Sequence, residues 1–127
     1  MARPQPRPTD AELAILRVLW ERGASTVRQV HEALADTRET GYTTTLKLMQ
    51  IMADKGLVKR NETARTHVYS PVAGEEQTQR QLVQDLVDRA FGGSAAQLVM
   101  RALSAEGASD ADLKQIRKLI DDYREKK

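Results

Sequence analysis

Apolar residues in the first half of the chain recur at helical spacing, and each run follows a residue that can cap a helix. The pattern Thr9-Asp10-Ala11-Glu12 is a capping box, and it predicts a helix over residues 10–21. A second capping box, at Thr26 and Gln29, precedes another amphipathic run. The apolar stripes of these runs are Leu13, Leu16 and Trp20, then Val27, Val30 and Leu34. We therefore predict two short amphipathic helices ahead of the polar stretch 36–41.

A third amphipathic helix is predicted from Tyr42 or Thr43 to Lys55, with Gly56 as its C-terminal cap. The stripe expected to be buried consists of Thr45, Leu48, Met49 and Met52. The opposite, polar side carries Thr43, Lys47, Gln50 and Asp54, flanked by Thr44 and Ile51. Because its two sides differ so sharply, this helix is expected to pack on one side and offer polar groups on the other.

Two β-biased runs follow, residues 57–60 and 66–69, joined by a polar loop that contains Arg65. Three helices followed by a hairpin form the winged helix-turn-helix arrangement, in which the third helix enters the major groove and the hairpin reaches an adjacent phosphate strand or minor groove. We predict a mainly α protein with a winged-helix DNA-binding domain over residues 9–73. The Pro- and Arg-rich residues 1–8 are expected to form a flexible tail.

The candidate DNA contacts lie on the third helix and in the hairpin loop. Lys47 can reach a base acceptor or a phosphate, and Gln50 can pair with adenine. Thr43 and Thr44 can donate to a phosphate or touch a thymine methyl, and Arg65 is expected at the tip of the wing. An ordinary solvated helix face also carries Thr, Lys and Gln, so this helix alone leaves both interpretations open.

The distribution of charge favours DNA. Residues 1–73 hold eleven Lys and Arg against eight Asp and Glu, a net charge of +3, whereas residues 74–127 hold nine against ten, a net charge of −1. An excess of positive charge in one part of a chain is typical of a surface that binds a polyanion. The alternative is a winged helix that assembles with other proteins without binding DNA, because a fold does not dictate a function.

Every element predicted beyond Gly74 is a helix. Apolar stripes fall within residues 82–90, 98–103 and 113–123, and Gly92-Gly93 separates the first from the second. Three stripes in about fifty residues make too small a core to be stable alone, so a second copy of the chain is the simplest partner. We predict that residues 74–127 form a dimerisation region. The predicted contact residues are Leu82, Leu86, Leu98, Val99, Leu103, Ile116 and Ile120.

Several function classes are excluded or disfavoured by what the sequence lacks. The chain has no Cys, and its two histidines, His31 and His67, are far apart, so neither a metal site nor another cofactor is expected. Trp20 and both histidines are interpreted as structural or surface residues, and no catalytic arrangement is found, so the chain is not expected to be an enzyme. No apolar run approaches the roughly 18 residues of a spanning helix, and no signal peptide is present, so we expect a cytoplasmic protein without membrane contact.

Five short stretches combine into a more specific pattern than any single helix. They are Pro8-Thr9-Asp10-Ala11-Glu12-Leu13-Ala14-Ile15-Leu16-Arg17-Val18-Leu19-Trp20, Thr26-Val27-Arg28-Gln29-Val30-His31-Glu32, Tyr42-Thr43-Thr44-Thr45-Leu46, Lys55-Gly56-Leu57-Val58 and Tyr69-Ser70-Pro71. In this combination the chain resembles the penicillinase-repressor family, the BlaI/MecI type of transcriptional regulator, from Pro8 to its end. The resemblance implies a homodimeric repressor, whose winged helix binds a dyad-symmetric operator and whose C-terminal helices form the dimer.

The resemblance also implies how repression ends. In characterised members a membrane-bound sensor protease triggers cleavage in the short helix that follows the glycine pair, and the broken dimer leaves DNA. The corresponding bond lies near Arg101-Ala102, where the staphylococcal members have an Asn-Phe pair. A second departure is Ile51, where relatives often carry an Arg that anchors a phosphate. The copper-responsive branch has a Cys-rich C-terminal metal site, and this Cys-free chain excludes that route.

Overall fold

The computed structural model of the chain describes residues 7–37, 39–63 and 65–126. Of the predicted flexible tail, residues 1–6 lie outside this part of the chain. The chain divides into two compact units, Met1–Leu82 and Val83–Lys127. The domain boundary predicted after residue 73 stays a prediction.

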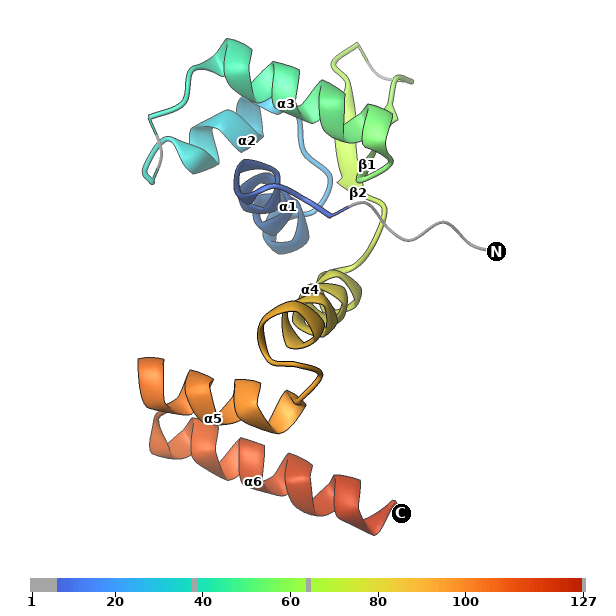
Figure 1. Cartoon of the computed structure of the whole chain (residues 1–127). Helices are drawn as coiled ribbons and strands as arrows, with labels where there is room; N and C mark the ends of the chain where they lie inside the picture. The colour runs from blue at the N-terminus through green and yellow to red at the C-terminus, as the bar shows by residue number, and fades with distance from the viewer. Residues whose placement is uncertain (1–6, 38, 64, 127) are drawn as a thin grey trace, which may run out of the picture. The chain divides into compact units, whose positions relative to one another are not determined.

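The first unit is a small helical domain with a two-stranded hairpin (Figure 1). Its elements are α1 (Asp10–Arg22), α2 (Val27–Leu34), α3 (Tyr42–Lys55), β1 (Val58–Asn61) and β2 (Val68–Pro71), followed by the first part of α4 (Glu75–Ala90). The strands are antiparallel, with Val58 opposite Pro71 and Asn61 opposite Val68. We call residues 58–71 the wing. The predicted winged-helix fold, three helices and a hairpin, is confirmed.

Capping residues explain where several of the helices begin or end. The Glu12 N–H donates to the Thr9 hydroxyl at 3.2 Å, and the Thr9 N–H donates to the Glu12 carboxylate at 2.8 Å. Thr26 and Gln29 make the same reciprocal pair at the start of α2. Gly56 ends α3 with a φ of +86°, a left-handed conformation that a residue with a Cβ rarely adopts. These caps lie where the sequence predicts them.

The core of the first unit is aliphatic, with one buried aromatic ring. Its buried residues are Ile15, Leu16, Leu19, Val27, Val30, Leu34, Met49, Met52, Leu57, Val58 and Tyr69. Trp20 is half-buried against this core, and its indole N–H donates to the Ala73 carbonyl at 3.0 Å. Trp20 therefore holds the chain that leaves β2 against α1, which agrees with its interpretation as a structural residue.

The wing is attached to the loop between α1 and α2 through backbone hydrogen bonds. The Ser25 N–H donates to the Tyr69 carbonyl at 3.0 Å, and the Tyr69 N–H donates to the Ser25 carbonyl at 2.8 Å. This one-residue antiparallel bridge places the start of α2 beside the wing. Two segments that are more than forty residues apart in the sequence are thus held together.

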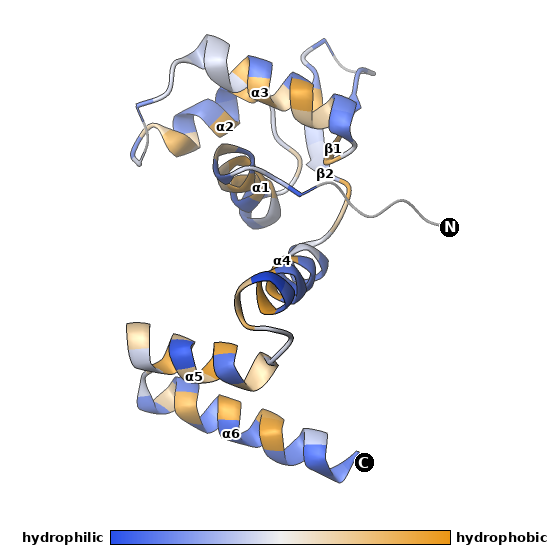
Figure 2. Ribbon diagram, viewed as in Figure 1, coloured by the Kyte–Doolittle hydropathy of each residue, from blue (hydrophilic) through white to orange (hydrophobic). Residues whose placement is uncertain are grey.

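The second unit contains the end of α4, together with α5 (Ala95–Glu106) and α6 (Asp110–Glu125), which run in opposite directions (Figure 1). Ser94 caps α5, and Ser109 forms a capping box with Asp112 at the start of α6. Hydrophobic residues recur among charged ones along α6 (Figure 2). The structure describes every residue of α5 and α6, and none of their side chains is buried. Among the described residues, no helix is long and apolar enough to cross a membrane.

Candidate nucleic-acid interface

The outer side of α3 is polar and open to solvent. Thr43, Thr44, Lys47 and Gln50 are all exposed there, whereas Thr45, Met49 and Met52 on the inner side are buried. The structure therefore brings four of the predicted DNA-binding residues onto the exposed side of one helix. Ile51 borders this surface and is 37% exposed.

An ion pair between the first turn of α1 and the last turn of α3 helps to hold α3 in place. The Lys55 ammonium donates to both carboxylate oxygens of Glu12, at 3.0 and 2.9 Å. Glu12 is only 1% exposed. Burial by itself raises the pKa of Glu12, but the Thr9 N–H, the Lys55 ammonium and the Thr9 hydroxyl outweigh it and lower the pKa below its ordinary value. Glu12 is thus a buried carboxylate held in its charged form.

A cleft with a cavity volume of about 560 Å³ lies between the start of α2, one side of α3 and the wing. We call it the cationic cleft. It is lined by Thr26, Val27, Arg28, Tyr42, Leu46, Gln50, Arg60, Arg65, Thr66, His67 and Tyr69. Of the predicted DNA-binding residues, Gln50 and Arg65 line this cleft, whereas Thr43, Thr44 and Lys47 do not.

Positive charge dominates the cationic cleft, because three arginines line it and no Asp or Glu is among its described lining residues. Arg60 forms an ion pair with Glu62, which lies outside the cleft. The Tyr69 hydroxyl accepts a hydrogen bond from Arg60 and, together with the nearby Glu62 carboxylate, raises the pKa of Arg60 above its ordinary value. In the part of the chain that the structure describes, neither Arg28 nor Arg65 has a carboxylate partner.

Arg28 lies against an aromatic ring. Its guanidinium carbon is 5.4 Å from the centre of the Tyr42 ring, within the range of a cation–π interaction. His31, one helical turn further along α2, meets the same ring edge-on, with ring centres 5.9 Å apart. Tyr42 is 40% exposed, so its ring remains at the surface while it contacts both side chains.

Sequence reasoning missed Arg28, Tyr42, Arg60 and His67 as parts of this surface. Arg28 had a usable signal, since it stands in the first turn of the predicted second helix, a position that commonly faces DNA phosphates in helix-turn-helix proteins. Tyr42 begins α3 and reaches the cleft through the packing of α3 beside α2, which places its ring against Arg28. Arg60 and His67 had no signal, because they belong to the wing, which the Ser25–Tyr69 bridge brings beside the start of α2. His67 lies in the loop before β2, one residue outside the strand.

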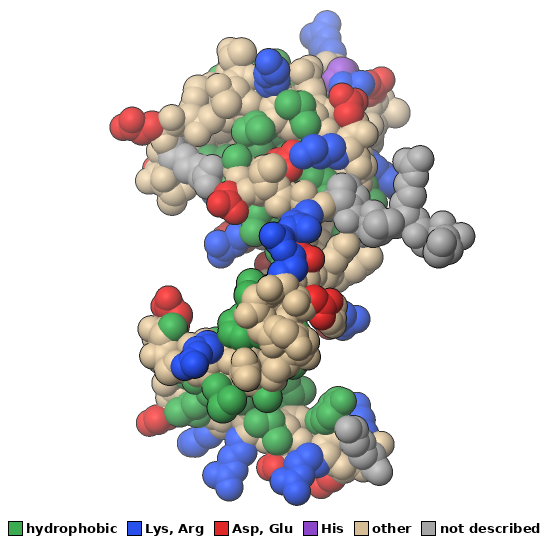
Figure 3. Space-filling view, in the orientation of Figure 1, with side chains coloured by type: hydrophobic (Ala, Val, Ile, Leu, Met, Phe, Trp, Pro, Cys, Tyr) green, Lys and Arg blue, Asp and Glu red, His purple; other side chains and the backbone are tan. Residues whose placement is uncertain are grey.

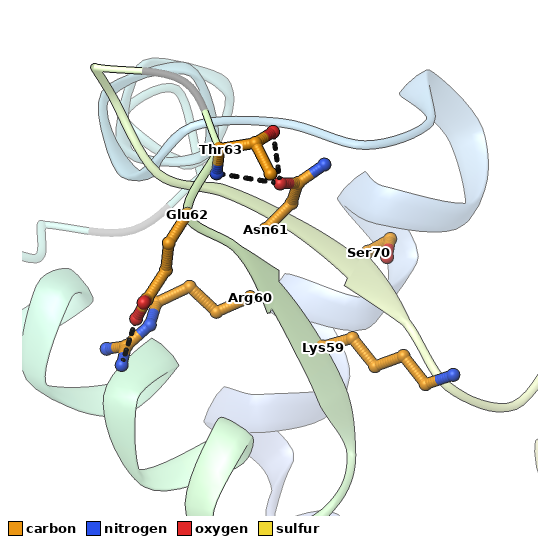
Figure 4. Close-up of a pocket in the computed structure, with 6 residues that line it drawn as sticks. All are labelled: Lys59, Arg60, Asn61, Glu62, Thr63 and Ser70. Atoms are coloured by element: carbon orange, nitrogen blue, oxygen red, sulfur yellow. Dashed lines mark hydrogen bonds and ion pairs between the residues drawn. The ribbon is translucent and has the colours of Figure 1, made fainter.

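The wing also carries a hollow of about 650 Å³, lined by Lys59, Arg60, Asn61, Glu62, Thr63 and Ser70 (Figure 4). The Asn61 side-chain oxygen accepts hydrogen bonds from the Thr63 N–H at 3.0 Å and from the Thr63 hydroxyl at 2.7 Å. The Asn61 side chain therefore holds the turn that follows β1. Figure 4 shows Lys59 extending away from the Arg60–Glu62 pair, so this hollow is a flank of the wing rather than a cluster of converging groups.

The residues predicted to form a dimer are unevenly exposed. Leu86, Val99 and Ile120 are exposed, whereas Leu82, Leu98, Leu103 and Ile116 are half-buried within a single chain. Further exposed hydrophobic residues of the second unit, which the sequence analysis did not single out for this role, are Val83, Met100, Leu113, Leu119 and Tyr123. Hydrophobic side chains gather on the surface of this unit (Figure 3). Arg101 and Ala102, the predicted cleavage region, are exposed on α5.

Comparison with known proteins decides the family. The model of the penicillinase repressor family matches residues 8–122. The chain belongs to the penicillinase repressor family. Among curated relatives, it is 37% identical to the transcriptional regulator BlaI of Mycobacterium tuberculosis over 105 residues, which cover 81% of this chain and 76% of that protein. It is 20% identical to the penicillinase repressor of Bacillus licheniformis over 122 residues, covering 96% of this chain and 95% of that repressor. The family predicted from the sequence is confirmed.

Solved structures agree with the fold of the first unit. The solution structure of the DNA-binding domain of the repressor BlaI matches with a TM-score of 0.51 and 24% identity, covering 58% of this chain and 90% of that domain. The monomeric form of the Bacillus licheniformis BlaI in complex with the blaP half-operator matches with the same TM-score and identity, covering 59% of this chain and 92% of that structure. At this identity the likeness shows the winged-helix fold.

Proposed function

We propose that this penicillinase repressor family protein is a sequence-specific DNA-binding transcriptional repressor that acts as a homodimer on a dyad-symmetric operator. The observation that carries the proposal is the exposed polar side of α3, with Thr43, Thr44, Lys47 and Gln50, next to a cleft lined by three arginines. A helix that offers base-reading side chains beside cations for phosphates has the two components of specific DNA binding. The half-operator complex of a relative with the same fold supports the proposal.

Each residue has a separate role in this proposal. Lys47 and Gln50 stand on the open side of α3, where they reach base edges in the major groove. Thr43 and Thr44, in the first turn, donate hydrogen bonds to phosphates or contact thymine methyls. Arg65, in the loop of the wing, neutralises a phosphate.

The homodimer is proposed to form through the C-terminal helices. In α5 and α6 no side chain is buried, while Val99, Met100, Leu119 and Ile120 are 42–69% exposed. A second copy of the chain would remove this apolar surface from water, which is the main favourable term in association. We call the winged-helix domain of one copy a head. Two heads that are tethered in a dimer and bind two half-sites can gain roughly 10²–10⁴ in affinity over a single head.

Release of the operator is proposed to act on the same region, by proteolysis near Arg101-Ala102 or by another signal. Both residues are exposed and lie in the middle of α5, so cutting there would divide the helix and separate α6 from the rest of the chain. The partner in this step would be a sensor protease. Loss of the dimer would remove the advantage of tethering without altering any contact between a single head and DNA.

A gel-shift of the full chain against fragments of its own upstream region, run at two salt concentrations, tests the proposal. Specific binding that weakens steeply with salt supports a repressor, because displaced counterions make phosphate contacts sensitive to salt. A fragment of scrambled sequence is the matched control and should bind more weakly. Failure to prefer any fragment over the scrambled control would favour the alternative, a winged-helix module for protein–protein assembly.

A further inference from the structure

The cationic cleft contains two arginines that lack an acidic partner among the described residues, and they come from different parts of the first unit. Arg28 is in the first turn of α2, and Arg65 is in the loop of the wing. Arg60, the third arginine, is already engaged by Glu62 and Tyr69. No carboxylate is among the described lining residues, so Arg28 and Arg65 bring two positive charges to the cleft without an ion-pair partner there.

Other side chains that line the cleft can also donate hydrogen bonds. Thr66 can donate a hydrogen bond and His67 carries a ring nitrogen that can do the same, while Gln50 reaches the cleft from α3. A guanidinium presents its N–H groups in a planar fork that matches the oxygens of a phosphate, so two arginines beside further donors form a typical phosphate-binding set.

Tyr42 restricts where Arg28 can point. A free arginine side chain has many rotamers, and holding it over a ring reduces the conformational entropy that is lost when it binds an anion. The guanidinium carbon of Arg28 is 5.4 Å from the centre of the Tyr42 ring, and the His31 ring contacts Tyr42 in a T-shaped arrangement. A cation–π contact uses no N–H–acceptor pair, so the guanidinium can still donate hydrogen bonds to an anion.

We propose that the cationic cleft holds a backbone phosphate of bound DNA, with Arg28 and Arg65 contacting the phosphate and Tyr42 acting as a positioning residue for Arg28. This inference rests on the proposed function and adds to it a phosphate site between α2 and the wing. The site fixes the position of the head along the backbone, so that α3 meets the bases in register. A free phosphate ion offers the same oxygens to the two arginines, so the test has to distinguish the two sources of phosphate.

The first experiment measures DNA affinity of the full chain over a series of salt concentrations, on a duplex selected by the protein from a randomised pool. Arg28→Gln is expected to weaken binding about tenfold near 0.1 M salt and to lower the slope of log affinity against log salt by about one. Arg17→Gln, which removes an exposed arginine of α1 outside the cleft, is the matched control and should leave the slope unchanged. An unchanged slope for Arg28→Gln would overturn the inference.

A set of Tyr42 variants distinguishes a role in positioning Arg28 from an effect on the stability of the fold. Tyr42→Phe keeps the ring and should bind as the wild type does, whereas Tyr42→Leu keeps an apolar side chain without a π face and should weaken binding about threefold. Combined with Arg28→Gln, the Tyr42→Leu change should cost nothing further, because the ring acts through Arg28. Additive losses in the double variant would show that Tyr42 does not position Arg28 and would overturn that part of the inference.

Two further measurements identify the source of the phosphate. A duplex with one neutral methylphosphonate linkage, moved along each strand, should bind the wild type more weakly at one position and affect Arg28→Gln little at that position. If no position shows this dependence on Arg28, the inference is wrong. Inorganic phosphate at 10 mM, with ionic strength matched by chloride, should displace no more DNA than chloride does, and Arg28-dependent displacement would instead identify a site for a free anion. A wild-type protein that selects no duplex at all would refute the proposed function itself.

Discussion

Replacing Glu12 by Gln tests how α3 is held in the first unit. Gln has nearly the same size and still offers an oxygen to the Thr9 N–H, but it removes the charge that binds Lys55 at 2.9 and 3.0 Å. Hydrogen bonds to charged groups contribute roughly 1.5–3 kcal/mol. The Lys55 side chain is 38% exposed, so solvent screens the ion pair. In the variant, the Lys55 ammonium can be hydrated instead. We therefore expect a loss of about 1–2 kcal/mol in the free energy of unfolding, within the range for charge-assisted bonds after screening.

The sign of the pH dependence follows from the lowered pKa of Glu12. A carboxyl whose pKa is lower in the folded state stabilises the fold at pH values above its ordinary pKa of 4.5. This stabilisation is lost as the pH falls through the lower, folded-state pKa of Glu12. The Gln side chain cannot titrate, so the difference between wild type and Glu12→Gln should be full at pH 7 and should shrink at a pH below 4.5.

Urea unfolding followed by Trp20 fluorescence measures this difference, because the sequence has a single Trp and it packs against the core of the first unit. Glu21→Gln is the matched control, since it removes an exposed carboxylate from the same helix and should change stability by less than about 0.5 kcal/mol. Equal urea midpoints for wild type and Glu12→Gln at pH 7 would refute the reasoning. A difference that stays the same down to pH 3 would show that the charge of Glu12 is not its cause.

Three further predictions concern DNA binding and assembly. Lys47→Ala should weaken operator binding by about 1–3 kcal/mol if Lys47 reads a base, and wild-type affinity in a gel-shift would contradict its place in the interface. Ile51→Arg adds a cation to the open side of α3 and should tighten binding to all sequences while steepening the salt dependence by about one charge; an unchanged slope would exclude Ile51 from the neighbourhood of a phosphate. A chain ending at Met100 should keep the Trp20 unfolding transition but dimerise poorly and lose most operator affinity. Sedimentation and gel-shift measure both, and a tight dimer would contradict the role of the C-terminal helices.

Local signals in the sequence predict the helices well because the groups that fix their ends are close along the chain. The partners in each capping box are three residues apart, so Thr9 and Ser109 identify helix starts without knowledge of the tertiary structure. The strands are less well placed, since the first begins at Val58 rather than at Leu57. The Leu57 N–H donates to the Met52 carbonyl at 2.9 Å, so this residue completes the end of α3 before the strand starts.

The candidate interface likewise has one part that the sequence predicts and one part that it does not. Thr43, Lys47 and Gln50 are predictable because helical periodicity puts them opposite the buried stripe of α3. The cationic cleft is not predictable, because it combines residues 26–28 with the wing, and the Ser25–Tyr69 bridge that joins these two segments links residues far apart in the sequence. A single backbone bridge between distant residues leaves no periodic or compositional trace in a sequence. The dimerisation residues stay a prediction for a related reason, since their partner would be another copy of the chain.

The Ser25–Tyr69 bridge also limits aggregation through the edge of the sheet. A strand at the edge of a sheet is a template for strands from other chains, and aggregation commonly begins there. Ser25 occupies the backbone groups of Tyr69 on the outer edge of β2, and the opposite edge belongs to β1, which carries Lys59 and Arg60. Charged residues on an edge strand oppose strand addition. A second copy of the first unit would thus find no open, uncharged strand edge on the described part of the wing to which it could add a strand.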